Sequence, residues 1–282
     1  MKKNTLWLVL AAVAAVITLL AGPVLASGIE PYQLGFQESV TPVADQIHSF
    51  HNMMLWIISG ITIFVMLLLA YVMIRFRAGA HPVPSSTTHN VPLEIVWTVI
   101  PVLILIIIAV PSLKLLYFTD RIENPELTLK VTGNQWNWSY EYPDFEGLSF
   151  SSYMIPTKDL DASKGQQRLL STDNQIVLPV DTTVQFVITA SDVLHSFTVP
   201  AFGIKVDAVP GRLNETWAKV TKTGTYYGQC SELCGKDHAF MPIEVRVVSK
   251  EDFTAWAEAA KTNFVNYDTF LTQRGTTAAV AE

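Results

Sequence analysis

Two long apolar stretches constrain this chain more than any other feature of its sequence. Residues 53–74 contain no charged side chain. As a helix this stretch is about 33 Å long, which matches the hydrocarbon thickness of a bilayer. A second stretch, residues 91–116, contains Pro101 and Pro111, which membrane helices tolerate where neighbouring helices satisfy the freed carbonyls. We therefore expect an anchor of two membrane-spanning helices.

The charges around these stretches predict how the anchor is oriented. Arg75 and Arg77 follow the first stretch, and residues 75–90 contain no acidic residue. Because basic loops stay on the cytoplasmic side, this loop is expected to be cytoplasmic. Residues 27–52 and everything after the second stretch then face the opposite side. In a bacterium this places the chain in the inner membrane, with its larger part in the periplasm.

The N-terminus resembles an exported protein. Lys2 and Lys3 precede an apolar run over residues 6–20 and a small-residue pattern at 24–26, which together are typical of a secretory signal. We expect residues 1–26 to be a cleaved signal peptide. The alternative is an uncleaved third membrane helix, since the apolar run is near the length at which the two classes overlap.

From residue 120 the pattern changes to short runs rich in Val, Ile, Thr and aromatic residues, separated by turn residues. Many short strands at this spacing predict an antiparallel sandwich or barrel over residues 120–248. Residues 249–282 are expected to form a short helix, capped by Ser249 and Asp252, followed by a frayed tail from Gly275. The expected strands cover residues 127–132, 135–142, 175–180, 183–190, 193–200, 215–220, 225–229 and 243–248.

Four potential metal donors lie close together in residues 228–242, namely Cys230, Cys234, His238 and Met241. The two cysteines, the only ones in the chain, could form a disulfide in an oxidising compartment. With His238 and His195 they could instead form a closed tetrahedral zinc site. Thiolate, imidazole and thioether together favour copper, and one cysteine more than a mononuclear blue-copper site requires suggests two copper ions that share thiolates.

At this point the sequence resembles a known family. Residues 228–242, together with 192–200 and 205–212, resemble subunit II of aa3-type cytochrome c oxidases, which carries a dinuclear copper centre called CuA. The resemblance implies a cupredoxin-like Greek-key sandwich on the membrane hairpin. It implies that Cys230 and Cys234 bridge the two ions. The remaining donors would be His195 and Met241 on one ion, and His238 with the main-chain carbonyl of Glu232 on the other.

The same resemblance assigns roles to three further side chains. The carboxylate of Glu232 would reach a magnesium or manganese ion shared with subunit I. Trp136, which alternates with Trp138, Tyr140 and Tyr142 on one face of an expected strand, would receive the electron from cytochrome c. The surrounding GNQWNW departs from the family's common GHQWYW at Asn134 and Asn137. Glu94 would lie at the mouth of a proton pathway, although a carboxylate there could simply stabilise a helix N-terminus.

The charge of the chain indicates the kind of partner. The formal net charge is −6, which excludes the basic surface that nucleic acids require. The resemblance implies a lysine-rich cytochrome c as electron donor and oxidase subunits I and III as membrane partners. The oxygen-reducing site would belong to subunit I, so this chain would supply electrons without carrying that site. The acids expected to dock the donor lie in turns: Asp144, Glu146, Asp159, Asp173 and Asp192.

Three other protein classes were weighed against this interpretation. A quinol oxidase subunit II shares the anchor and fold but lacks copper ligands. A copper-carrying assembly protein needs a labile site instead of six donors. The copper domain of nitrous oxide reductase has no membrane hairpin. The complete donor set and the hairpin therefore favour the oxidase subunit.

Overall fold

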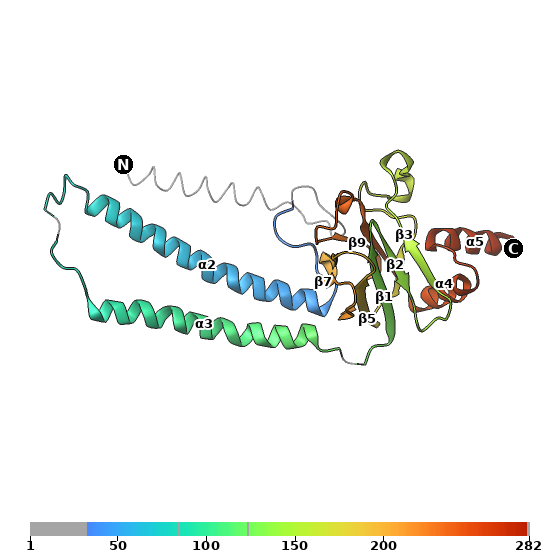
Figure 1. Cartoon of the computed structure of the whole chain (residues 1–282), viewed down its shortest axis with the longest axis horizontal. Coiled ribbons are helices and arrows are strands. Elements are labelled where there is room, and N and C mark those ends of the chain that lie inside the picture. Colours follow the sequence, from blue (N-terminus) through green and yellow to red (C-terminus); the bar gives the residue numbers. More distant parts are fainter. Residues whose placement is uncertain (1–32, 84, 123, 281–282) are drawn as a thin grey trace. The chain divides into compact units, whose positions relative to one another are not determined.

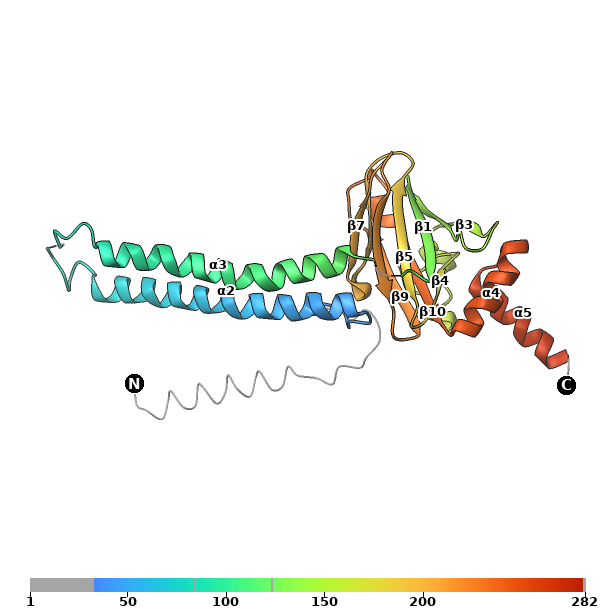
Figure 2. The same ribbon diagram turned by 90° about the horizontal axis from the view of Figure 1, so that it is seen from below.

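The computed structural model describes residues 33–83, 85–122 and 124–280, with side chains up to Gly275. The expected signal peptide, residues 1–26, lies outside the described residues. Two long helices come first, α2 (Pro42–Arg75) and α3 (Val91–Asp120), and they lie side by side (Figures 1 and 2). Both are long and apolar enough to cross a membrane.

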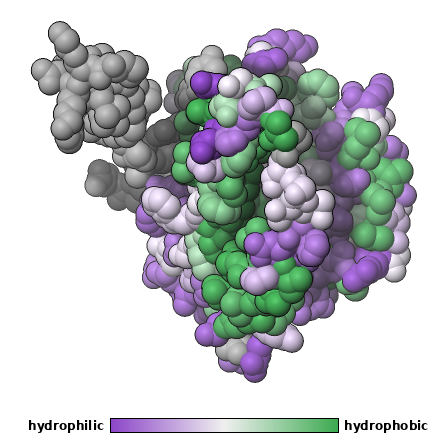
Figure 3. All heavy atoms as spheres, turned by 90° about the vertical axis from the view of Figure 1, so that its left-hand side faces the viewer, coloured by the Kyte–Doolittle hydropathy of each residue, from purple (hydrophilic) through white to green (hydrophobic). Residues whose placement is uncertain are grey.

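Both helices are longer than the apolar stretches alone predict. The side chain of Thr41 caps α2 by accepting a hydrogen bond from Ala44 N at 3.0 Å, and proline occupies the first turn. Such a cap allows the helix to begin in the polar segment that carries Asp45 and His48. Apolar side chains are exposed along the length of both helices. Figure 3, in which the helices are seen end-on, shows part of this apolar surface in green. A lipid environment accounts for that exposure.

The rest of the chain forms a β-sandwich. In the part of the chain that the structure describes, ten strands form two five-stranded sheets, ordered β3-β2-β1-β5-β8 and β4-β10-β9-β6-β7. The strands of the first sheet are β1 (Leu127–Asn134), β2 (Asn137–Glu141), β3 (Ser149–Ser152), β5 (Thr183–Ala190) and β8 (Asn214–Lys219). Those of the second sheet are β4 (Ile176–Pro179), β6 (His195–Val199), β7 (Ile204–Ala208), β9 (Gly224–Cys230) and β10 (Pro242–Val248).

Short helices occupy the connections and the end of the chain. The connections contain four 3-10 turns: η1 (Thr157–Asp159), η2 (Ala162–Lys164), η3 (Pro200–Phe202) and η4 (His238–Phe240). Helix α4 (Lys250–Thr262) begins with the expected cap, since Ser249 Oγ accepts a hydrogen bond from Asp252 N at 3.1 Å. Helix α5 (Tyr267–Val280) follows it.

The sandwich expected from the sequence is confirmed, but several details are wrong. Two strand pairs, β1 with β5 and β4 with β10, are parallel, so the sheets are not wholly antiparallel. The strands β3 and β7 were not expected. The backbone is helical through Val280, where a frayed tail from Gly275 was expected. Trp136 lies in the turn between β1 and β2 and is not part of a strand, because β2 begins only at Asn137.

The core lies between the two sheets. Burial alternates strictly along β1 and β5, so that one face of the first sheet is apolar. Phe197 of β6 fills the space opposite this face, with its ring centroid 5.4 Å from Trp138 and 5.9 Å from Phe186. Such aromatic contacts add to the burial of apolar area in holding the two sheets together.

Candidate metal centre

The donors expected from the sequence meet at one end of the second sheet. His195 is the first residue of β6 and Cys230 is the last of β9, and these antiparallel strands are neighbours in the sheet. The loop between β9 and β10 carries the other donors. Because β10 pairs back onto β9, with Pro242 opposite Gln229, the loop must return and places Met241 beside the cysteines.

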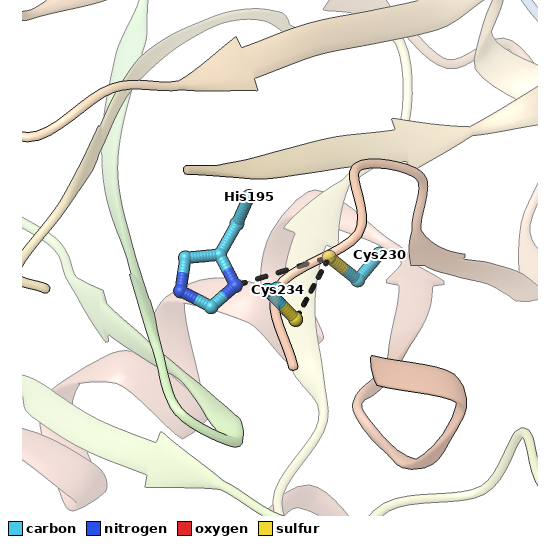
Figure 4. Close-up of side chains that lie close together, drawn as sticks. All are labelled: His195, Cys230 and Cys234. Atoms are coloured by element: carbon cyan, nitrogen blue, oxygen red, sulfur yellow. Dashed lines mark hydrogen bonds between the residues drawn. The ribbon is translucent and has the colours of Figure 1, made fainter. Parts of the chain in front are cut away.

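The four other expected donors each lie within contact distance of one of the two cysteine sulfurs. The two Sγ atoms are 3.9 Å apart, and both cysteines are free thiols, whereas a disulfide requires about 2.05 Å. Cys230 Sγ lies 3.8 Å from His195 Nδ1 and 3.3 Å from the carbonyl oxygen of Glu232. Cys234 Sγ lies 3.5 Å from both His238 Nδ1 and Met241 Sδ. Figure 4 shows the imidazole of His195 directed at the sulfurs.

The site is enclosed by protein on most sides. His195 is fully buried, and Cys230, Cys234 and Met241 are buried as well, whereas His238 is half-buried. Gly133 of β1 makes room for the imidazole, because a Cβ atom at this position would lie 2.9 Å from the ring of His195. A side chain at residue 133 would therefore displace a metal donor.

The two thiols differ in how readily they ionise. Burial by itself raises the pKa of Cys230, but hydrogen bonds with His195, Ser196 and Glu232 outweigh it and lower this pKa to about 7. For Cys234, burial and the neighbouring charge on Cys230 raise the pKa to about 12. The protein alone therefore stabilises one thiolate at neutral pH and not the second. A bound metal cation supplies the charge that a pair of thiolates requires.

Asp192 holds His195 in the orientation that a metal site requires. Its Oδ1 lies 2.9 Å from His195 Nε2, which leaves Nδ1 to face the sulfur. The carboxylate is itself fixed by the backbone N–H groups of Gln135 and Val193, at 2.7 and 2.6 Å. Burial alone would lower the pKa of His195, but the contacts with Cys230 and Asp192 raise it. Asp192 was expected to dock a partner, although its position three residues before His195 was a signal for this contact.

The turn that carries Trp136 lies against the metal loop. Trp136 Nε1 and Gln135 Nε2 both donate to the carbonyl oxygen of Cys234, at 3.3 and 2.8 Å. Trp138 Nε1 donates to the carbonyl oxygen of Met241 at 3.1 Å. The two tryptophans therefore hold the backbone at two of the expected ligands, one from the half-buried turn and one from the core.

The other acids expected to dock a partner do not gather around the site. Asp144 accepts a hydrogen bond from Thr128 N at 2.7 Å, at the start of β1, whereas Gly133 contacts His195 near its end. Asp173 accepts from Tyr153 N at 2.7 Å, and burial raises its pKa. Glu146 and Asp159 are exposed, Glu146 in the loop between β2 and β3 and Asp159 in η1. The carboxylate of Glu232 is also exposed.

Glu94 makes the contact that its helix-terminus alternative predicts. Its Oε1 accepts a hydrogen bond from Asn90 N at 3.2 Å, while Asn90 Oδ1 accepts one from Leu93 N at 3.2 Å. This reciprocal cap satisfies two backbone donors at the start of α3. It neither requires nor excludes a second role for the carboxylate.

Comparison with known proteins identifies the family to which this chain belongs. The sequence profile described as "Cytochrome C oxidase subunit II, periplasmic domain" matches residues 127–248. The profile described as "Cytochrome C oxidase subunit II, transmembrane domain" matches residues 29–115. This chain belongs to the cytochrome c oxidase subunit II family. The resemblance noted in the sequence is thereby confirmed, and the chain is a two-pass membrane subunit of a respiratory oxidoreductase.

Relatives from distant organisms share most of the chain. A probable cytochrome c oxidase subunit 2 of Rickettsia prowazekii is 55% identical over 225 residues, which are 80% of this chain and 71% of the relative. Cytochrome c oxidase subunit 2 of Branchiostoma floridae is 47% identical over 81% of this chain and 96% of its own. Among solved structures, the periplasmic domain of subunit II from Bradyrhizobium japonicum has 52% sequence identity and a TM-score of 0.47, covering 51% of this chain and all of that one.

Within the cytochrome c oxidase subunit II fold, the donor set fits a copper centre. His195, Cys230 and Cys234 offer ligand atoms that all lie within 4.8 Å of one another. Zinc sites do not use a thioether such as that of Met241 as a ligand, whereas copper is bound by thiolate, imidazole and thioether together.

Proposed function

We propose that this subunit accepts electrons from a c-type cytochrome at a dinuclear copper centre, CuA, and passes them to subunit I. There oxygen would be reduced to water and protons pumped. The observation that carries this proposal is the arrangement of four further donors around two cysteine sulfurs 3.9 Å apart. A mononuclear blue-copper site uses one thiolate, so a second buried thiol in contact with further donors supports a pair of ions.

Each donor has a distinct task in this proposal. Cys230 and Cys234 would bridge the ions, His195 and Met241 would complete one, and His238 with the carbonyl of Glu232 the other. When bound, two copper ions that share thiolates supply a one-electron carrier. The protein fixes these donors in advance, since Asp192 orients His195 and the two tryptophans hold the backbone of Cys234 and Met241. Such fixed donors favour little rearrangement when the charge changes.

Trp136 is proposed as the residue through which the electron enters. Its Nε1 donates to the carbonyl oxygen of Cys234, so one hydrogen bond connects the ring to an expected copper ligand. The ring is only half-buried, which leaves part of it available to a partner. Its neighbours Trp138 and Tyr140 are buried and serve the core.

The donor is proposed to be a basic cytochrome c attracted by the acidic charge of the chain. Of the expected docking acids, Asp144, Glu146 and Asp159 are exposed, so their charge is available to attract such a donor. Asp173 has a structural hydrogen bond to the backbone, and Asp192 holds His195. Asp173 and Asp192 therefore have a structural role, and their negative charge adds to the attraction of the donor.

Three further assignments complete the proposal. The carboxylate of Glu232, which is exposed, is proposed to reach a magnesium or manganese ion at the contact with subunit I. Subunit III would be a further membrane partner. The chain would reside in a bacterial inner membrane with its copper domain in the periplasm, because the arginine-rich end of α2 favours the cytoplasm.

Copper content and an EPR spectrum of the purified subunit test the main proposal. We expect about two copper ions per chain and a spectrum in which the unpaired electron couples to both nuclei, because two thiolates are shared. A single copper ion with a blue-copper spectrum would contradict the dinuclear assignment.

Glu94→Gln separates the proposed proton pathway from helix capping. The glutamine keeps an Oε1 that can accept the hydrogen bond from Asn90 N, so the cap survives while the ionisable group is lost. Turnover of the assembled oxidase is expected to fall at least about tenfold, as on loss of a proton-transferring group. Reduction of copper by cytochrome c should remain normal. Unchanged turnover would leave Glu94 with the capping role alone.

A further inference from the structure

Lys236 places a positive charge over the ring of Trp136. Its Nζ lies 5.7 Å from the centroid of that ring. The side chain of Lys236 is 78% exposed, and Asp237 Oδ2 lies 3.8 Å from Nζ. An exposed pair at this distance neutralises the ammonium only weakly. The half-buried ring therefore presents a cation to any partner that approaches it.

The backbone of the metal loop fixes this arrangement. Cys234 accepts the hydrogen bond from Trp136 Nε1, and Lys236 covers the ring. Between them Gly235 has a φ of +127°, and a Cβ atom there would lie 2.8 Å from Trp136 Cζ2. Three consecutive residues of the loop thus lie close to one tryptophan. The loop thereby keeps the backbone of Lys236 near the ring of Trp136.

This local charge is opposite to the charge of the whole chain, which is −6. Long-range attraction therefore favours a partner with positive charge, whereas the short-range contact at Trp136 disfavours a positive charge at that one place. A lysine of the partner placed against Trp136 would meet Lys236 at close range, where like charges repel. A carboxylate at the same place would form an ion pair with it.

We propose that Lys236 is a specificity-determining residue that selects electron donors presenting a carboxylate, and not a lysine, to the face of Trp136. This inference rests on the proposed role of Trp136 as the point where the electron enters. The preferred donor would carry basic residues around its contact surface, to suit the acidic chain, and an acidic residue at its centre. Rejecting the wrong donor by a repulsive charge is a common source of specificity.

The test uses two donors and a charge series at one position. The donors are a basic c-type cytochrome and its variant with one lysine beside the exposed haem edge replaced by glutamate. Binding to the full-length subunit in detergent is measured as an association rate at low and at high ionic strength, with Lys236 intact and as Lys236→Arg, Lys236→Gln and Lys236→Glu. Lys250→Glu is the matched control. Lys250 is 52% exposed and lies 3.9 Å from Glu126, and it follows the end of β10 remote from Met241.

We expect Lys236→Gln to speed association of the basic cytochrome about threefold and Lys236→Glu about tenfold at low ionic strength, as expected for one or two charges at about 6 Å. The glutamate variant of the cytochrome should show the reverse order, and Lys236→Arg should behave as the original chain. Both effects should shrink at high salt. The inference is wrong if Lys236→Glu changes the association rates of both donors in the same direction. It is also wrong if Lys236→Glu changes these rates no more than Lys250→Glu does.

Reduction of copper by the same donors separates this inference from the proposed function. If Trp136→Ala slows reduction while the preference between donors does not depend on Lys236, the electron enters at Trp136 and the specificity inference fails. If the preference follows the charge of residue 236 but Trp136→Ala reduces copper at the normal rate, Lys236 selects the donor and the proposed role of Trp136 fails.

Discussion

Replacing Cys230 with serine is expected to abolish the dinuclear copper centre. Copper content should fall from about two ions per chain to one or none, and the EPR signal coupled to both ions should disappear. The thiol of Cys230 has a pKa of about 7 through its contacts with His195, Ser196 and Glu232. A serine hydroxyl stays protonated under the same conditions and is too hard a ligand to bridge copper.

Cys234→Ser should have the same effect for a different reason. Burial and the charge of Cys230 raise the pKa of Cys234 to about 12, so its thiolate depends on a bound cation more than that of Cys230 does. Ser231→Ala is a suitable control, because Ser231 lies in the same loop and only its backbone N–H is engaged, donating to Ser196 O at 3.0 Å. Far-UV circular dichroism would show that each variant is folded. Two ions retained in either folded cysteine variant would rule out bridging by that residue.

Trp136→Ala is expected to slow reduction of copper by cytochrome c on the order of 10²-fold, the scale on which a misplaced contact reduces a reaction rate. The substitution removes an aromatic contact and no charge. The dependence of association on ionic strength should therefore stay as it is. Stopped-flow reduction across a range of ionic strengths measures both properties in one experiment.

Trp136→Phe distinguishes the ring from its hydrogen bond. Phenylalanine keeps an aromatic ring but cannot donate to the carbonyl oxygen of Cys234, as Trp136 Nε1 does at 3.3 Å. Near-normal reduction in Trp136→Phe would assign the effect to the ring, and slow reduction in both variants would assign it to the hydrogen bond. The copper EPR spectrum of each variant shows whether the site is intact. A normal rate in Trp136→Ala would mean that the electron enters elsewhere.

Neutralising exposed acids should produce the opposite pattern. Changing Glu146 and Asp159 to their amides is expected to slow association and flatten its salt dependence, since screened charges act within about 8 Å at physiological ionic strength. Electron transfer in the bound complex should change little. Asp192 is unsuitable for this comparison, because its Oδ1 lies 2.9 Å from His195 Nε2 and its loss would disturb a metal donor.

Features that depend on local patterns could be predicted from the residues alone. Apolar length predicted the two helices, alternation of apolar residues predicted most strands, and the donor types at residues 230–241 predicted the chemistry of the metal loop. These patterns are readable because helix period, strand period and ligand softness are properties of neighbouring residues. The beginning of α2 at Pro42 was missed, because the cap at Thr41 extends the helix into a polar segment.

Contacts between segments that are far apart in the sequence became apparent only in the folded chain. His195 and Cys230 are 35 residues apart, and pairing of β6 with β9 brings Nδ1 of the one to 3.8 Å from Sγ of the other. The same packing placed Lys236 over Trp136. Strand order and loop contacts depend on how whole faces of the sheets pack against each other. The sequence of one segment does not specify which other segment it packs against.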